Sequence, residues 1–575
     1  MGVKLAETAG FCMGVKRAVD IVLDVAHDKG DQKIYTYGPL IHNPQTVELL
    51  EKRGVIPVES IDDVHEGTII IRAHGISLDE RQKLKEKGMK IIDATCPKVA
   101  RVQSIIKKHA SQGYTVIIAG DKDHPEVVGL LGYAQGRGVV VSDGDDIDRL
   151  SDFDKVCVVA QTTQNIKEYE EIIRRIKKKY PTTIVFDTVC DSTEKRQTEI
   201  RTLAHEMDAM VVVGGKNSAN TRRLAEISRE SGIPTFHIET ADELKQAQIN
   251  GYNNVGISAG ASTPNWIIDG VIDYIAQYRE EKGQKRVGSL YKLWLFTVKT
   301  DIYSSIGAGC LSLVGTFVQG LSFTIFNVLM ASSYVFAMHT INRVQDKYVG
   351  RIRGSFREET YVRYKKVFVA VGVSSLLLSL VLAFISGVAP FLLLLFISVL
   401  GMFYNIEVFP RSWRFTKLGD LPGSKTVFVA LAWAIVTVVV PQSRVSLVIT
   451  PEMVTAFLFI FTVVFVKSSL SDMLEIQSDR FVGRETIPVV IGEKKTKELL
   501  IIISLIVGMI LVASVVAGYA SPLNIVLLIS IFYVWICIKL CDMRTQFSSI
   551  VLEGLLETNF IIAGLGGCLW VIFST

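Results

Sequence analysis

The sequence has no strong net charge, no CxxC pair in its first half and no apolar core of signal-peptide type at its amino terminus. Its 62 Lys and Arg against 58 Asp and Glu give a formal net charge of +4, which argues against a globally basic nucleic-acid-binding protein. The hydrophobic content of 49% excludes intrinsic disorder. The four cysteines of the first half are widely spaced, and without an export signal we expect a reducing cytoplasm, where metal or catalytic roles are favoured over disulfides.

Long apolar runs are absent up to about Lys285 and frequent after about Asp301. Dense charge in the first part is typical of a soluble domain, whereas apolar runs separated by short charged loops are typical of membrane-spanning helices. The sequence therefore predicts a soluble domain over residues 1–282, a linker over 283–300 and a polytopic membrane domain over 301–575.

Three segments of the soluble half align on a cysteine, which indicates a threefold internal repeat. A basic residue follows each cysteine by five positions. The segments are AGFCMGVKRAVDIV with Cys12 and Arg17, DATCPKVARVQSII with Cys96 and Arg101, and DTVCDSTEKRQTEI with Cys190 and Lys195.

Two further elements repeat in the same way, each a short β-type run that ends at a glycine or at polar residues. One set reads IYTYGPLIHNP with His42, TVIIAGDKDHPE with His124, and VVVGGKNSANT with Ser218 and Asn220. The other reads TIIIRAHG with His74, VCVVAQTTQ with Thr162 and Thr163, and VGISAGASTP with Ser258 and Ser262.

This alternation of β-branched runs and helical segments predicts α/β units with small parallel sheets. Ligands bind at the carboxyl ends of the strands in such sheets, which is where the polar residues fall. Three lobes would bring Cys12, Cys96 and Cys190 around one centre, and three thiolates suit zinc or an iron–sulfur cluster. Because no fourth cysteine has an equivalent position, we expect a [4Fe-4S] cluster with one iron open to substrate. Protonated histidines would supply charge for an anion, and Glu126 is a candidate proton donor.

The motifs FCMGVKRAV, YGPLIHNP, RAHG, DATCPKV, GDKDHPEV, QTTQ, VCDSTEKRQ, GGKNSANTRRL and GASTPNW resemble the LytB (IspH) family. These enzymes are 4-hydroxy-3-methylbut-2-enyl diphosphate reductases of isoprenoid biosynthesis, and the resemblance runs from residue 1 to about 280. It implies a two-electron reductive dehydroxylation that yields isopentenyl and dimethylallyl diphosphate, with ferredoxin or flavodoxin as electron donor. It also implies cluster ligands Cys12, Cys96 and Cys190; diphosphate ligands His42, His74, His124, Ser218, Asn220 and Ser262; and catalytic Thr162, at the substrate hydroxyl, and Glu126, which feeds it protons.

The second half contains nine candidate membrane spans. The loops at about 342–366, around Arg411 and at about 467–497 are rich in Lys and Arg, whereas those at 386–390 and 518–522 have none. Basic loops lie inside, so we expect the head in the cytoplasm and a multi-pass protein of the inner (cytoplasmic) membrane. The expected spans lie near 303–319, 321–341, 366–386, 388–406, 425–442, 452–470, 498–518, 522–542 and 556–573.

Two basic loops of the membrane half carry polar and acidic residues near the ends of spans. Asn342 and Asp346 are one helical turn apart, and the i, i+3, i+7 spacing predicts Asp472, Glu475 and Asp479 on one helical face. Carboxylates at that depth are costly unless they are paired or bind a metal. Mg²⁺ carried on a diphosphate would satisfy these side chains.

These motifs, together with LPGSKTVFVALAW, resemble the UbiA superfamily of membrane prenyltransferases over about 290–575. The second motif matches D-x-x-[D/E]-x-x-x-D followed by G-R-x-T-I-P. The first motif departs from the family pattern, because Gly350 stands where its last aspartate is expected. The resemblance implies transfer of an allylic prenyl group, with Mg²⁺, to an aromatic or other lipid-pathway acceptor.

Three functional hypotheses follow. In the first, the chain is a bifunctional isoprenoid enzyme in contact with membrane lipid, with a reductase head and a prenyltransferase body. In the second, the reductase is the sole activity and the membrane half is an anchor or scaffold, which Gly350 favours. In the third, the head is a cluster-based sensor, which the complete polar set around the cysteines disfavours. All three exclude nucleic acid as a partner.

Overall fold

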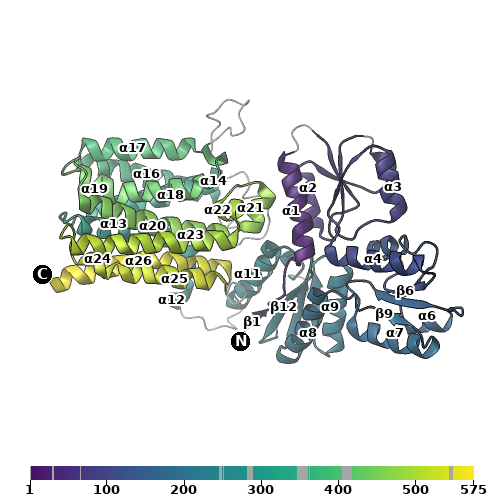
Figure 1. Ribbon diagram of the computed structural model, residues 1–575. Coiled ribbons are helices and arrows are strands. Elements are labelled where there is room, and N and C mark those ends of the chain that lie inside the picture. The colour runs from purple at the N-terminus through teal and green to yellow at the C-terminus, as the bar shows by residue number, and fades with distance from the viewer. Residues whose placement is uncertain are drawn as a thin grey trace. The chain divides into compact units, whose positions relative to one another are not determined.

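The computed structural model describes residues 2–28, 32–64, 66–244, 249, 251–281, 289–345, 361, 363–404, 418–542 and 548–574. The chain divides into two compact units, residues 1–276 and 277–575 (Figure 1). The first is built from α/β lobes and the second from helices.

The first unit contains three parallel sheets of four strands with one shared strand order. Lobe 1 has the order β3-β2-β4-β5, lobe 2 has β7-β6-β8-β9, and lobe 3 has β11-β10-β12-β1, so the amino-terminal strand completes the last lobe. The predicted threefold α/β repeat is therefore confirmed. The strands are β1 (Val3–Leu5), β2 (Ile34–Tyr37), β3 (Val55–Val58), β4 (Thr68–Ile71), β5 (Lys90–Asp93), β6 (Thr115–Ala119), β7 (Gly138–Val141), β8 (Val156–Ala160), β9 (Ile184–Val185), β10 (Ala209–Val213), β11 (Thr235–Ile238) and β12 (Val255–Ala259).

The central strands form because runs of β-branched residues can be buried on both faces of a parallel sheet. Every residue of β4, β8, β10 and β12 is buried. Helices cover the sheets, as Figure 1 shows for α3 in lobe 1 and for α6 and α7 in lobe 2. They are α1 (Met13–Asp28), α2 (Pro44–Glu51), α3 (Leu78–Glu86), α4 (Pro97–Ser111), α5 (Pro125–Leu131), α6 (Gly144–Asp148), α7 (Ile166–Lys179), α8 (Asp191–Glu206), α9 (Ala219–Glu230), α10 (Ala241–Leu244) and α11 (Asn265–Glu281).

The lobes carry equivalent residues after equivalent strands. The second strand in each sheet order (β2, β6 or β10) precedes His42, His124, or the pair Ser218 and Asn220, respectively. The third strand (β4, β8 or β12) precedes His74, Thr162 or Ser262, respectively. The remaining outer strand (β5, β9 or β1) precedes a cysteine. Because the carboxyl ends of parallel strands share one edge of a sheet, each lobe presents its chemistry on one side.

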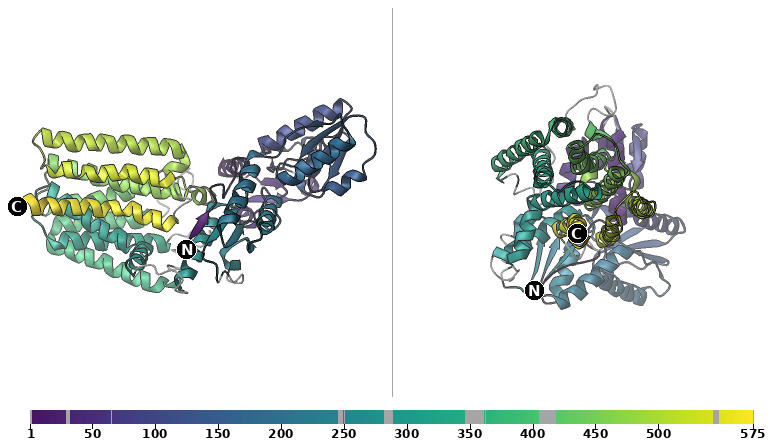
Figure 2. Two further views of the ribbon diagram at one scale, coloured as in Figure 1. Left: turned by 90° about the horizontal axis from the view of Figure 1, so that it is seen from below. Right: turned by 90° about the vertical axis from the view of Figure 1, so that its left-hand side faces the viewer.

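The second unit is a bundle whose long helices run side by side in both views of Figure 2. Apolar side chains from most of these helices share one buried core. The helices are α12 (Ser289–Lys299), α13 (Ile302–Val318), α14 (Ile325–Gln345), α16 (Lys365–Ser386), α17 (Val388–Phe403), α18 (Ser424–Ala434), α19 (Val440–Ser443), α20 (Pro451–Leu474), α21 (Ile476–Val482), α22 (Ile487–Ile491), α23 (Glu493–Val516), α24 (Leu523–Val526), α25 (Leu528–Asp542) and α26 (Ser549–Ser574).

Six helices of the described residues are long and apolar enough to cross a membrane, or seven if the bent pair α12–α13 counts as one span. Each of the nine predicted segments contains helix, but the count of qualifying spans differs from nine. Helix α17 has only 16 residues, and α14 carries Asn327, His339 and Asn342 among its apolar residues. The chain is thus a membrane protein with six or seven candidate spans.

Helices α12 and α13 meet at an angle of 84° beside Asp301, whose φ of 59° is rare outside glycine. The Asp301 carboxylate is buried and accepts hydrogen bonds from Arg343 at 3.1 and 3.2 Å and from the Tyr361 hydroxyl at 2.7 Å. These contacts fix the end of α14 next to Asn342.

Candidate active site

Each of the three predicted cluster ligands stands at the start of a helix. Cys12 directly precedes α1, and Cys96 and Cys190 are the N-cap residues of α4 and α8. The Val15 N–H donates to Cys12 Sγ at 3.4 Å. Free N–H groups and the helix dipole favour a thiolate at these positions.

The three thiols lie close to one another. A Cβ on Gly14 would lie 2.5 Å from Cys96 Sγ and 4.0 Å from Cys12 Sγ, so only glycine leaves room between these sulfurs. Burial raises the pKa of the Cys96 thiol; N–H groups of its own helix oppose this, and the nearby Cys12 and Cys190 thiols raise it further. Ligands of one zinc ion would have sulfurs only about 4 Å apart, given Zn–S bonds of about 2.3 Å. Among the described residues, the three thiols do not form a group with all ligand atoms within 4.8 Å of one another.

Basic side chains join the three cysteine loops in a closed ring. Each helix that starts at a cysteine carries one basic side chain that contacts a group beside the next cysteine. Of these three side chains, only Arg17 is among the basic residues that align in the sequence repeat. The contacts are Arg17 to the Thr95 carbonyl at 3.0 Å, Lys98 to both carboxylate oxygens of Asp191 at 3.0 Å, and Arg196 to the Gly10 carbonyl at 2.7 Å.

The predicted diphosphate histidines of lobes 1 and 2 form a cluster. The ring centroids of His42, His74 and His124 lie 4.6 to 5.7 Å apart, and one ligand nitrogen from each falls within 4.8 Å of the others. His42 Nε2 and His74 Nδ1 are buried without a hydrogen-bond partner. Buried polar atoms are normally paired, so these nitrogens indicate a place for a polar ligand.

Burial, together with nearby cations that include Arg222, lowers the pKa of His42 to about 4 and that of His124 to about 3. Burial also lowers the pKa of His74, and the neighbouring His42 and His124 rings contribute to this shift. The lowered pKa values favour neutral rings at neutral pH in the protein without a ligand, whereas the predicted protonated histidines concern the anion-bound site. An anion bound among them would raise their pKa values and draw in protons.

Lobe 3 brings its polar residues to the His42 loop. The Ser262 hydroxyl donates to the His42 carbonyl at 3.3 Å, and a Cβ on Gly215 would lie 2.4 Å from the same oxygen. Ser218 caps α9 by accepting from the Thr221 N–H at 3.4 Å. Asn220 Nδ2 is buried without a partner, so this lobe also offers a donor to a ligand.

Glu126 and Thr162 form a buried pair in lobe 2. The Thr162 N–H donates to Glu126 Oε1 at 2.7 Å and its hydroxyl donates to Oε2 at 2.9 Å. Burial raises the pKa of Glu126; the bonds from Thr162 and the cation of Arg223 oppose this, and Asp121 raises it further. A carboxyl group with a raised pKa next to a hydroxyl can hold and pass a proton. Thr162 also ties this pair to the cysteine side, because its carbonyl accepts from the Cys190 N–H at 2.9 Å.

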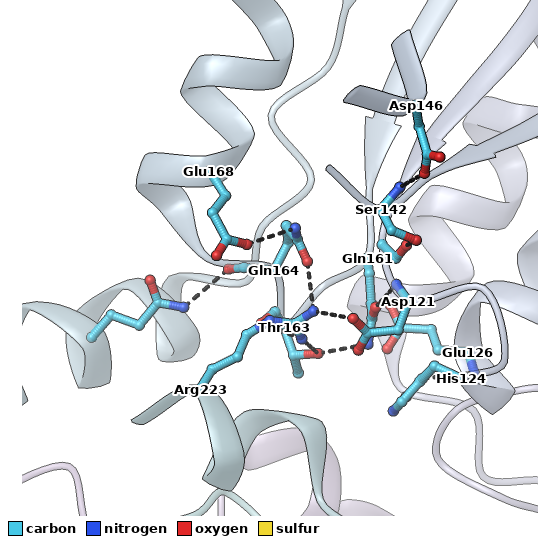
Figure 3. A network of polar contacts seen from close by, with 12 residues as sticks. Asp121, His124, Glu126, Ser142, Asp146, Gln161, Thr163, Gln164, Glu168 and Arg223 are labelled. Carbon is cyan, nitrogen blue, oxygen red and sulfur yellow. Dashed lines mark hydrogen bonds and ion pairs between the residues drawn. The ribbon is translucent and has the colours of Figure 1, made fainter. Parts of the chain in front are cut away.

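Arg223 is a site residue that the sequence reasoning missed. It lies on α9 and is 8% exposed, in a network with Asp121, Thr163 and Gln164 (Figure 3). Helical spacing could have identified it, because Arg223 lies three residues after Asn220 and four before Ile227, on the buried face of α9.

In the membrane unit, Asp472 and Asp479 are buried and Glu475 is exposed. The prediction of one continuous helical face is wrong, because α20 ends at Leu474 and α21 begins at Ile476. Asp346 and Gly350 lie outside the described residues.

Cations and unpaired oxygens accompany these carboxylates. Asp472 accepts from the Thr426 hydroxyl at 2.6 Å and lies 3.7 Å from Lys425 Nζ. Asp479 lies 3.5 Å from Arg484, and its Oδ2 is buried without a hydrogen-bond partner, as is Oδ1 of Asn342. Burial raises the pKa of Asp479 to about 7, and the negative charge of Glu475 contributes. An unpaired oxygen among carboxylates and cations is suited to a metal ion with an anionic ligand.

Comparisons with known proteins divide the chain at the same place. Residues 3–276 match the family model "LytB protein", and residues 303–550 match the "UbiA prenyltransferase family" model. The 4-hydroxy-3-methylbut-2-enyl diphosphate reductase of Geobacter sulfurreducens is 44% identical over 282 residues, which cover 49% of this chain and 99% of that protein.

Two solved structures match different halves. A structure of (E)-4-hydroxy-3-methyl-but-2-enyl diphosphate reductase is 45% identical, with a TM-score of 0.39, and covers 48% of this chain and 100% of that one. A UbiA homologue from Archaeoglobus fulgidus, bound to GPP and Mg²⁺, is 17% identical, with a TM-score of 0.36, and covers 48% of this chain and 99% of that one.

Proposed function

Because the chain belongs to the LytB family over residues 3–276 and carries a UbiA prenyltransferase family domain over residues 303–550, we propose that it is a membrane-bound 4-hydroxy-3-methylbut-2-enyl diphosphate reductase with a second, prenyl-transferring site. The main observation behind the reductase assignment is that the residues after equivalent strands of the three lobes lie close together. A histidine cluster with unpaired nitrogens, a buried Glu–Thr pair and three thiols all follow from that one repeat.

The three thiols fit a [4Fe-4S] cluster. Each stands at a helix N-terminus, which stabilises negative charge, and Gly14 leaves the space between two of them empty. A cluster held by Cys12, Cys96 and Cys190 supplies low-potential electrons and an open iron as a Lewis acid. A ferredoxin or flavodoxin would deliver the electrons.

The polar residues bind and orient the substrate. The diphosphate lies against His42, His74 and His124 and against Ser218, Asn220 and Ser262, and the protons that the histidines take up offset its charge. Burial among these groups excludes water from the reacting end. The allylic hydroxyl then faces Thr162.

Glu126 and Thr162 move the proton. The reaction consumes two electrons and two protons: the C–O bond breaks, a C–H bond forms and water leaves. In the structure the Thr162 hydroxyl donates to Glu126 Oε2; for transfer, this hydroxyl turns to donate to the departing oxygen and accepts the proton of Glu126. Burial raises the pKa of Glu126 and so favours its protonated form, which can give up the proton when the leaving oxygen becomes more basic.

The test is anaerobic turnover of the full-length protein in detergent or lipid discs. We expect 4-hydroxy-3-methylbut-2-enyl diphosphate to be converted into isopentenyl and dimethylallyl diphosphate when a one-electron reductant is supplied. Cys96→Ser serves as a matched control that removes one ligand. No conversion by protein with full iron content would refute the reductase assignment and favour the sensor hypothesis.

The membrane half is the candidate for prenyl transfer. Asp472 and Asp479 would hold Mg²⁺ with the diphosphate of a prenyl donor, and Lys425 and Arg484 would contact its oxygens. The unpaired Asp479 Oδ2 favours this over a purely structural anchor. The basic loops of the sequence favour a cytoplasmic side for this end of the bundle and for the head, in a multi-pass protein of the inner membrane.

A further inference from the structure

Arg223 connects two lobes of the head. It projects from α9 in lobe 3, and all four of its hydrogen bonds go to lobe 2 (Figure 3). One terminal nitrogen donates to the Thr163 carbonyl at 3.1 Å and to its hydroxyl at 3.4 Å. The other donates to Asp121 Oδ1 and to Gln164 Oε1, each at 2.7 Å.

These acceptors flank the residues that move the proton. Thr163 and Gln164 directly follow Thr162, and Asp121 lies in the β6–α5 loop, which leads to Glu126. Gln161 joins the two loops: its side chain accepts from the Asp121 N–H at 3.0 Å and donates to the Thr163 hydroxyl at 3.0 Å. These contacts join the two loops, and Arg223 is bound to both.

The helix that carries Arg223 also carries part of the predicted diphosphate site. Ser218 caps α9 and Asn220 lies in its first turn, one turn before Arg223. A shift of α9 relative to lobe 2 would therefore change the distance between the diphosphate ligands and the Glu126–Thr162 pair.

We propose that Arg223 is a positioning residue that fixes Glu126 and Thr162 of lobe 2 relative to the diphosphate-binding end of α9. This proposal rests on the proposed reductase function. Arginine suits this position better than lysine, because its planar fork holds two terminal nitrogens in fixed directions toward the four acceptors, whereas an ammonium group offers three donors from a single nitrogen.

The charge of Arg223 matters separately from its geometry. The groups that face Glu126 are Thr162, His124, whose ring accepts from the Glu126 N–H at 3.1 Å, Arg223 and Asp121. Loss of the cation leaves Asp121 without its partner, and both changes favour the protonated form of Glu126. The limb of the pH–rate profile that reports Glu126 deprotonation then moves to higher pH.

The experiment compares Arg223→Met, Arg223→Lys and Arg229→Met in the full-length protein, after matching iron content. Arg229 is an exposed arginine of the same helix and is the control. We expect Arg223→Met to lower kcat about 100-fold, as expected for a misplacement of about 1 Å, with KM changed less than threefold. Its alkaline limb should move to higher pH. Arg223→Lys should keep the limb of the unmodified protein but still lose most of kcat.

Three results would overturn the proposal. They are a kcat for Arg223→Met within twofold of that for Arg229→Met, an equal loss in kcat and in substrate affinity, and a loss that disappears once iron content and thermal midpoint are matched. If the unmodified protein itself shows no turnover, the proposed function fails instead, so the two failures are distinguishable.

Discussion

Arg196, six residues after Cys190, donates a 2.7 Å hydrogen bond to the carbonyl of Gly10, two residues before Cys12. The same guanidinium donates to the Ala259 carbonyl at 3.0 Å and is 3% exposed. It thus ties the last cysteine helix to the first cysteine loop and closes the ring of basic contacts. The distance between two predicted cluster ligands depends on this side chain.

Arg196→Met should therefore impair assembly of the iron site. The substitution leaves two buried carbonyls without a donor, at a cost of about 1–3 kcal/mol each, and removes a cation close to two thiolates. We expect at least half of the bound iron to be lost, measured as iron per chain and by visible absorbance after anaerobic reconstitution. Lys195→Met, at an exposed position of the same helix, is the control. Equal iron in both variants would show that the ring does not set the thiol spacing.

Gly14→Ala should prevent stable iron binding without unfolding the head. Its Cβ would lie 2.5 Å from Cys96 Sγ, closer than any real Cβ contact, so the sulfurs must separate. Gly2→Ala is the matched control, since nothing lies within 4 Å of a Cβ there. The check is iron content together with the thermal midpoint. Normal iron in Gly14→Ala would contradict the predicted position of the cluster.

Binding of inorganic diphosphate should take up protons. The pKa of His42 is about 4 and that of His124 about 3 in the protein alone, and a bound anion raises both. Affinity should therefore rise as pH falls from about 8 toward 6, as far as the liganded pKa values lie in that range. Calorimetry in buffers of different ionisation enthalpy measures the uptake. The same measurement on His42→Gln separates proton uptake by His42 from protonation of the ligand itself. An uptake that is unchanged in this variant would show that His42 does not face the diphosphate.

Asp472→Asn and Asp479→Asn should abolish prenyl transfer and leave the reductase unchanged. Both carboxylates are buried, and removal of one charge removes a Mg²⁺ ligand. The measurement is consumption of geranyl diphosphate with Mg²⁺ by each full-length variant. Glu452→Gln, a partly exposed carboxylate in the first turn of α20, is the control. Transfer activity retained in both Asp variants would exclude this site, and no transfer by any form of the protein would favour the anchor hypothesis.

The sequence predicted the parts of the head that lie along its repeat. His42, His74 and Thr162 could be identified because each follows a β-branched strand at an equivalent place, and equivalent strands have equivalent ends. Arg223 could not, because its partners belong to another lobe, and Arg196 could not, because its partners lie far away along the chain; no spacing in the sequence encodes such contacts. In the membrane half, the spacing predicted one helical face from Asp472 to Asp479, whereas the helix breaks at Glu475. The protonation of the histidines also depends on burial, which composition does not reveal.

The most direct test of the account is the single-turnover and steady-state rate of 4-hydroxy-3-methylbut-2-enyl diphosphate reduction by the full-length protein, alongside Glu126→Gln with the same iron content. The account predicts turnover by the unmodified protein and a loss of about 100-fold or more in the variant, because glutamine keeps the bonds from Thr162 in part but carries no transferable proton. Equal rates for the two proteins would contradict the central claim that Glu126 feeds the proton to the departing hydroxyl.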